Sequence, residues 1–200
     1  MNRRILLLAI AGLFTINCFS QTENGNVTNV TKATIISPGL SYELRVGQFQ
    51  TLYAQAFMAP SFGISWSDAL GTNSFFYLDP AVTLQYRYYY NYRIRSENGK
   101  RTAMNSLNYI APVYEAVFSK QRVSSSQIIE TERRTINRLG IVWGFQRNYA
   151  SRFSLDFYAG PAYLFTKGTV QTGNDTYTET VSQLSAIIQI NLGFWLNKRK

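Results

Sequence analysis

Six charged residues are the main candidates for chemistry in this 200-residue chain. They fall on the polar positions of segments in which polar and apolar residues alternate, and they are Glu43, Arg45, Arg87, Glu115, Arg138 and Asp156. Because successive side chains of a β-strand point to opposite faces, all six would share one face of a sheet. On an enclosed face they could line an ion-selective path or pair with one another and fill the interior. We expect the second arrangement, a structural charge network.

Enzymatic chemistry has few candidate residues. The chain has no histidine and a single cysteine, Cys18. Histidine is the usual general base near neutral pH, so Ser-His-Asp hydrolysis is excluded, and a zinc site would lack both of its favoured ligands. Carboxylate pairs and a Ser-Lys dyad stay open, but no spacing singles out such a pair. The sequence therefore predicts no enzymatic activity, no catalytic or metal-binding residue and no cofactor.

The first twenty residues differ from the rest of the chain. Arg3 and Arg4 precede an apolar run at 5–16, and small residues at positions 18 and 20 suit cleavage before Gln21. This layout is typical of a signal peptide at 1–20, and the run is shorter than the roughly 20 residues of a membrane-spanning helix. An anchor helix and lipoprotein processing at Cys18 are the alternatives. A short segment at 21–28 and a single domain at 29–200 would follow.

The charge balance bears on partners. The chain has 20 Lys and Arg against 11 Asp and Glu, and only Arg3 and Arg4 belong to the expected signal peptide. For an exported protein this excess favours anionic lipid over nucleic acid as the partner.

A period of two runs through most of the chain. In TLQYRYYYNYRIR at 83–95 the even positions are aromatic or aliphatic and the odd ones are polar, with Tyr89 as the exception. The same alternation occurs at 51–66, 152–165 and 184–197. These strands are longer than the usual 5–6 residues of globular sheets. Long strands with one continuous apolar face are typical of a transmembrane β-barrel.

Turn signals divide the chain into strands. Tight turns are expected at Gly47-Gln48, at Asn98-Gly99 and at 148–151, and longer polar loops at 67–76, 120–134 and 167–181. Seven strands are clear, and bacterial single-chain barrels have an even number, so an eighth is expected at 29–36. The expected fold class is all-β, an eight-stranded antiparallel up-and-down transmembrane β-barrel.

Two features predict local irregularity. Leu107 and Tyr109 are out of phase with Ile110 and Tyr114, which a bulge near Tyr109 would reconcile. Prolines remove ladder hydrogen bonds, so we expect bulges near the outer rim at Pro60, Pro112 and Pro161.

Four segments together resemble small outer-membrane β-barrel proteins of Gram-negative bacteria: PGLSYELRVG at 38–47, QYRYYYNYRIRSENGKRTAMNS at 85–106, GIVWGFQRNYASRFSLDFYAGPAY at 140–163 and INLGFWLNKRK at 190–200. The resemblance implies location in the outer membrane and contact with its lipids and with the barrel-insertion machinery. The chain departs from the family's common assembly signal, which ends on an aromatic residue, because five residues follow Trp195.

The expected function is non-enzymatic. The barrel would act structurally or through an extracellular partner that binds the loops at 120–134 and 167–181, with its lumen plugged by charged side chains. The alternative is a soluble periplasmic lipocalin-like barrel that binds an apolar ligand inside. The two predict opposite facings: Arg87 and Asp156 point inward and Tyr88 outward in the first, and the reverse holds in the second.

Overall fold

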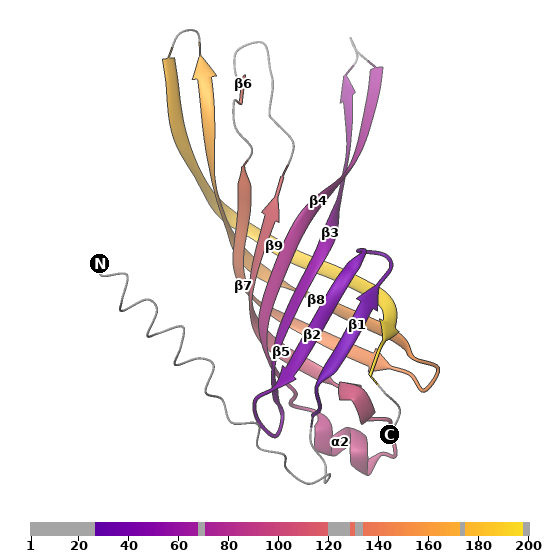
Figure 1. Ribbon diagram of the computed structural model, residues 1–200. Helices are drawn as coiled ribbons and strands as arrows, with labels where there is room; N and C mark the ends of the chain where they lie inside the picture. Colours follow the sequence, from indigo (N-terminus) through magenta and orange to yellow (C-terminus); the bar gives the residue numbers. More distant parts are fainter. Residues whose placement is uncertain (1–26, 68–70, 120–128, 131–133, 173–174, 198–200) are drawn as a thin grey trace, which may run out of the picture.

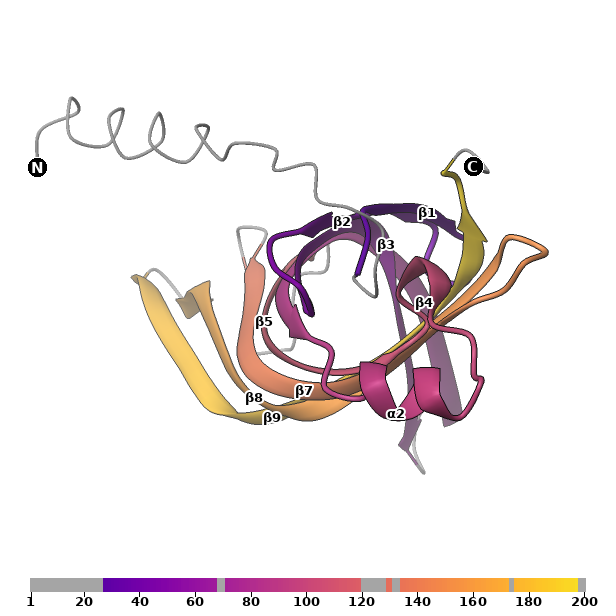
Figure 2. The same ribbon diagram turned by 90° about the horizontal axis from the view of Figure 1, so that it is seen from below.

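The described part of the chain is an all-β ring. The computed structural model describes residues 27–67, 71–119, 129–130, 134–172 and 175–197, so the expected signal peptide lies outside the described residues. Eight antiparallel strands, each paired with its neighbours in sequence, close into a ring (Figures 1 and 2). They are β1 (Val30–Thr34), β2 (Gly39–Arg45), β3 (Gln50–Ser67), β4 (Gly71–Tyr88), β5 (Asn108–Phe118), β7 (Thr135–Asn148), β8 (Phe153–Thr172) and β9 (Asp175–Trp195).

The ring closes through its shortest strand. The expected eighth strand at 29–36 forms as β1 and pairs with β9 from Lys32 opposite Trp195 to Thr34 opposite Gly193. The two backbones lie so close that a Cβ on Gly193 would overlap the carbonyl oxygen of Ala33, so this position needs glycine. The prediction of eight antiparallel strands is confirmed.

The two faces of the sheet have opposite character. Arg87 and Asp156 are buried inside the ring, while Tyr86 and Tyr88 are exposed on its outer surface. The same alternation holds for large outward side chains on the other strands, among them Leu40, Leu52, Leu84, Ile110, Leu139, Ile141, Trp143, Tyr163, Ile188 and Phe194. The charged face therefore points inward and the apolar face outward.

Two expected loops are largely strand. The ladder between β8 and β9 continues from Lys167 opposite Thr180 to Thr172 opposite Asp175, so the loop expected at 167–181 is the distal part of a long hairpin. The segment expected as a loop at 67–76 belongs mostly to β4, which pairs with β3 up to Ser67 opposite Gly71. Thr, Val, Tyr and Phe in these segments favour strands even where the sequence is polar. Of the loop expected at 120–134, the described residues include β6 (Ile129–Glu130), which pairs with β8.

The strand predicted at 83–95 ends at Tyr88. Helix α2 (Tyr92–Glu97) and the 3₁₀ turn η1 (Ala103–Asn105) follow, so the hairpin predicted at Asn98-Gly99 does not form. Gly99 instead ends α2 with φ 64°, where its N–H donates to Ser96 and that of Lys100 donates to Arg95. This is the Schellman motif, for which Asn-Gly is as suitable as for a hairpin. No helix among the described residues is long and apolar enough to cross a membrane.

The predicted bulges are absent. The ladder between β5 and β7 is continuous from Asn108 to Phe118, because the interior accepts Leu107 and Tyr109 without a change of register. The β4–β5 ladder is interrupted opposite Pro112 and the β7–β8 ladder opposite Pro161, with the same register on both sides of each gap. Pro60 lies in a continuous ladder with β4. Pro112 and Pro161 thus cost local hydrogen bonds without shifting a strand, and Pro60 does not interrupt its ladder with β4.

Candidate functional site: the polar interior of the barrel

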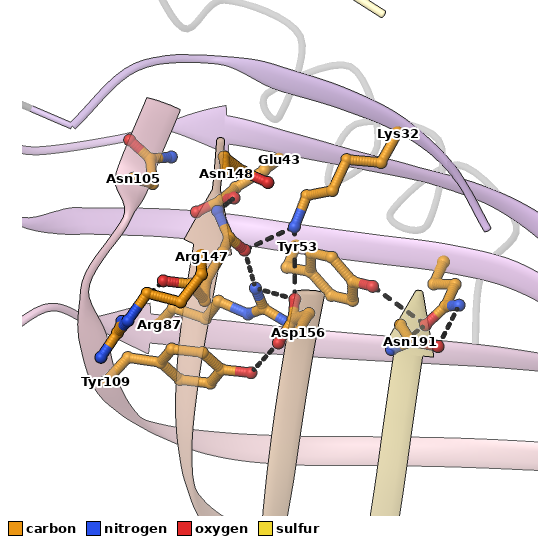
Figure 3. A network of polar contacts seen from close by, with 12 residues as sticks. Lys32, Glu43, Tyr53, Arg87, Asn105, Tyr109, Arg147, Asn148, Asp156 and Asn191 are labelled. Carbon is orange, nitrogen blue, oxygen red and sulfur yellow. Dashed lines mark hydrogen bonds and ion pairs between the residues drawn. The ribbon is translucent and has the colours of Figure 1, made fainter. Parts of the chain in front are cut away.

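Asp156 on β8 is the centre of a buried polar network (Figure 3). Its Oδ2 accepts from Arg87 Nη1 at 2.8 Å and from Lys32 Nζ at 3.3 Å, and its Oδ1 accepts from Tyr109 Oη at 2.8 Å. These partners come from β4, β1 and β5, so one carboxylate connects four strands from inside the ring. We call Lys32, Glu43, Arg87, Gln146 and Asp156 the interior network.

The guanidinium of Arg87 is held on several sides. Its carbon lies 3.6 Å from the ring centroid of Tyr53 and 4.2 Å from that of Tyr109, so it is enclosed by two aromatic faces. Its Nε donates to Gln85 at 2.7 Å, and Nη1 also donates to Gln146 at 2.8 Å. The fully buried arginine therefore has a carboxylate, two amides and two aromatic rings in place of water.

Glu43 forms the second acidic centre of the interior network. Its Oε1 accepts from Thr51 at 2.8 Å and from Tyr89 Oη, and its Oε2 accepts from Gln146 Nε2 at 3.2 Å. Tyr89 is the first residue after β4. Burial raises its pKa well above the ordinary value, and the Glu43 carboxylate raises that pKa further. The phenol therefore stays protonated and serves Glu43 as a hydrogen-bond donor.

The interior network is balanced in charge. Lys32 and Arg87 carry positive charge, and Glu43 and Asp156 carry negative charge. Such neutralisation is what burial of four ionised groups requires. The arrangement fills space and joins strands, and it contains no histidine or cysteine that could act as a nucleophile or base at neutral pH. Among the described residues no cluster of three or more metal-ligating side chains occurs.

The structure places the six predicted residues in three locations. Glu43, Arg87 and Asp156 belong to the interior network. Glu115 and Arg138 form a separate ion pair at 2.5 Å, and Glu115 lies towards the end of β5 that is farther along the chain from α2. The sixth, Arg45, joins neither group: its Nε donates to the Gly47 carbonyl at the β2–β3 turn, because β2 ends at this residue.

Sequence reasoning missed several members of the site. Lys32 lies on a strand whose alternation is poor, so its inward direction had no clear signal. Tyr89 breaks the alternation at 83–95 because it faces inward, and that exception was the available signal. Gln146 and the rings of Tyr53 and Tyr109 were missed because neutral residues were not considered as partners for the charges.

One end of the interior is covered by the connection between β4 and β5. Leu107 from this connection and Val27 from the N-terminal side are buried beneath the network. Asn105 and Thr28 exchange two hydrogen bonds of 2.8 Å, which fixes the two segments to each other. The lower end, where α2 lies in Figure 1, is therefore plugged by apolar as well as charged side chains.

Comparisons with known proteins add no family. A scan against models of protein families found no match to this chain, and searches of curated proteins and of solved structures found none either. The resemblance to small outer-membrane barrels therefore stays a prediction.

Replacement of Asp156 tests the role of the interior network. In Asp156→Asn, Lys32 and Arg87 would share one fewer negative charge, and we expect a loss of about 3–5 kcal/mol in the free energy of unfolding. Urea unfolding in detergent, followed by tryptophan fluorescence, measures this loss. Glu97→Gln, on the exposed surface of α2, is the matched control and should change stability by less than about 0.5 kcal/mol.

The double variant Lys32→Met/Asp156→Asn shows whether the loss of stability in Asp156→Asn comes from the ion pair with Lys32. Removal of one cation together with the anion should cost less than the sum of the two single changes, by about 0.5–3 kcal/mol. Strictly additive losses would contradict the ion pair.

Proposed function

We propose that this chain is a non-enzymatic outer-membrane β-barrel whose lumen is plugged by the interior network and whose role is structural or mediated by its long hairpins. The observation that carries the proposal is the inverted distribution of polarity: charges inside, large apolar side chains outside. A barrel in water would expose its polar face, whereas one in lipid presents an apolar band. The ring also leaves no open sheet edge around most of its circumference, as lipid requires.

Aromatic residues near the α2 end support a membrane interface there. Trp143 Nε1 donates to Tyr90 Oη at 2.7 Å on the outer surface, and the Phe145 and Phe157 rings lie 5.5 Å apart. Tryptophan and tyrosine concentrate where hydrocarbon meets headgroups, and barrels carry girdles of them.

The same end is rich in basic side chains. Arg152 lies 5.6 Å from the Trp195 ring and Arg147 lies 5.3 Å from the Phe145 ring, and with them are Arg93, Arg95, Lys100 and Arg101 against the single acid Glu97. Basic residues beside an anionic lipid surface contribute about 1 kcal/mol each. This supports an orientation with α2 on the periplasmic side.

The facings count against the lipocalin-like alternative. That hypothesis needs Tyr88, Leu155 and Leu192 in a cavity and Arg87 in water. Tyr88 is 47% exposed on the outside, and Arg87 is 0% exposed.

Fractionation tests the proposed location. The protein should stay with washed envelopes and be extracted only by detergent. Release by osmotic shock would contradict the proposal and favour a periplasmic protein.

An arginine introduced on the outer surface of the barrel tests the proposed contact with lipid. Ile141 is 61% exposed at the middle of β7, and Ile94 is 62% exposed on α2, outside the strands. Arginine near the bilayer midplane costs about 2–4 kcal/mol, so Ile141→Arg should impair folding into lipid vesicles. Ile94→Arg should fold like the parent chain. Equal yields for the two variants would show that the outer surface is not in lipid.

Cysteine labelling tests the orientation. Outside the expected signal peptide the chain has no cysteine. A single cysteine at Asn98→Cys, near α2, or at Thr178→Cys, in the β8–β9 hairpin at the other end, can therefore report which side of the membrane its end of the barrel faces. An impermeant maleimide applied to intact cells should label position 178 and spare position 98. The opposite pattern would mean that the barrel is inserted the other way up.

A further inference from the structure

A cavity of about 490 Å³ lies above the interior network, towards the end away from α2. Its volume is within the range of roughly 300–1,000 Å³ that is usual for small-molecule sites. The apolar part of its lining includes Phe57, Val117, Ile136 and Ile187.

The cavity passes through the wall of the barrel. Its lining includes Ile187 and Gln189 on the inner face of β9, and also Ile188 and Ile190 on the outer face, 69% and 47% exposed. A cavity that contacts both faces of one strand must extend around that strand's edge.

Strand lengths explain why this edge is free. β1 pairs with β9 only over three residues, and beyond them the Ile35 N–H donates to the Leu192 carbonyl at 2.7 Å. Figure 1 shows β1 and β2 ending well below the tops of the flanking hairpins. Alternate residues direct their backbone groups to the same edge, so those of Ile190 and Ile188 face the position that a longer β1 would occupy. Among the described residues no backbone group pairs with them there.

The other border of the gap is β3. β2 pairs with β3 up to Phe57, and the Met58 N–H donates to the Pro38 carbonyl at 2.9 Å. By the same alternation Pro60 has its nitrogen on this edge, where it has no N–H to leave unpaired. The turn at 35–38 therefore forms the lower border of an opening between β9 and β3.

Charged groups lie across the interior from this opening. Glu115 and Arg138 belong to β5 and β7, on the opposite side of the ring, and Arg134 also lines that wall. The Glu115 side chain is only 4% exposed, whereas that of Arg138 is 30% exposed. The other acid of the lining, Asp79 on β4, is only 2% exposed. Both carboxylates are therefore nearly buried, and the group most open to the cavity is the Arg138 guanidinium.

The geometry points to a binding site for a single-chain fatty acid, which would reach the cavity sideways through the gap between β9 and β3. The acyl chain lies against Ile187, Phe57 and the isoleucines at the mouth, and the carboxylate faces Arg138. This inference rests on the proposed function, since a barrel in lipid has such amphiphiles beside its outer surface. A guanidinium is well suited to a carboxylate in a low-dielectric site.

A strand from another chain is the competing occupant, because a free edge is a template for strand addition. The observations favour the fatty acid. A strand inserted into the gap would meet Pro60, which cannot donate to it, on the β3 side. A site that only added a strand to the edge would also not need the cavity behind it, with its apolar and charged lining.

Fluorescence binding tests the site in the full mature chain. The probe is cis-parinaric acid, with its methyl ester as the uncharged analogue, added to protein folded in amphipol. The parent chain should bind the acid saturably, and unlabelled stearate should displace it. The difference in electrophoretic mobility between unheated and boiled samples reports folding independently of binding.

Three variants locate the site. Ile187→Trp, which fills the cavity, should weaken acid binding at least about tenfold, and Ile110→Trp on the outer face of β5 should leave it unchanged. Arg138→Gln should weaken binding of the acid about tenfold and leave that of the ester unchanged. Should Ile187→Trp not fold, Arg138→Gln decides, because only a bound carboxylate would make it weaken the acid and spare the ester.

Several outcomes would overturn the inference. One is a folded parent chain with no saturable binding, and another is binding that Ile187→Trp leaves unchanged. Equal weakening of acid and ester by Arg138→Gln would remove the assigned carboxylate contact. A dimer that excludes the probe would show that a second copy covers the edge. All are distinct from failure of the proposed function, which fractionation measures.

Discussion

Neutralisation of buried charge is the constraint on which the rest of this barrel depends. Eight strands enclose a space that side chains must fill, and here the filling includes two acids and two bases without access to water. Asp156 meets both Lys32 and Arg87, which project from β1 and β4. Because β1 has only five residues and pairs with β9 over three, the ion pair of Lys32 adds a second attachment for the strand that closes the ring.

The polar interior determines the character of the outer surface. With a period of two, each inward Gln, Glu or Arg places its neighbours on the outside, and these neighbours are Leu, Ile, Tyr, Phe and Trp. The hydrophobic effect would oppose this arrangement in water, since the large apolar side chains gain nothing from folding when they stay exposed. In hydrocarbon the same arrangement is favourable, and the backbone ladder becomes the part that must be complete.

Alternation in the sequence predicted seven strands and the direction of their faces, because a period of two is a property of each strand alone. The first strand was predicted from the even strand number of bacterial barrels. Features that depend on where strands end were not predicted. Tyr88 ends β4 although the alternation continues to Ile94, and Asn98-Gly99 ends a helix. The alternation places Arg45 on the inward face, but this residue ends β2 and its side chain turns to the Gly47 carbonyl. Lys32 could be recognised as a partner of Asp156 only from the fold, which brings β1 and β8 together. The bulge predicted near Tyr109 was wrong because it assumed a uniformly polar interior.

Unequal strand lengths link closure of the ring to the opening in its wall. β1 and β2 reach only as far as the turn at 35–38, while β9 continues for many residues beyond its last pair with β1. A free edge in lipid is costly, yet the border of this gap is fixed by backbone hydrogen bonds from Ile35 to Leu192 and from Met58 to Pro38. A frayed end would not keep such bonds on both sides. Proline on the facing edge of β3 removes one unpaired donor from the gap. The short strands are thus joined to a gap with defined borders, behind which lies a cavity lined by apolar residues and by the Glu115–Arg138 ion pair.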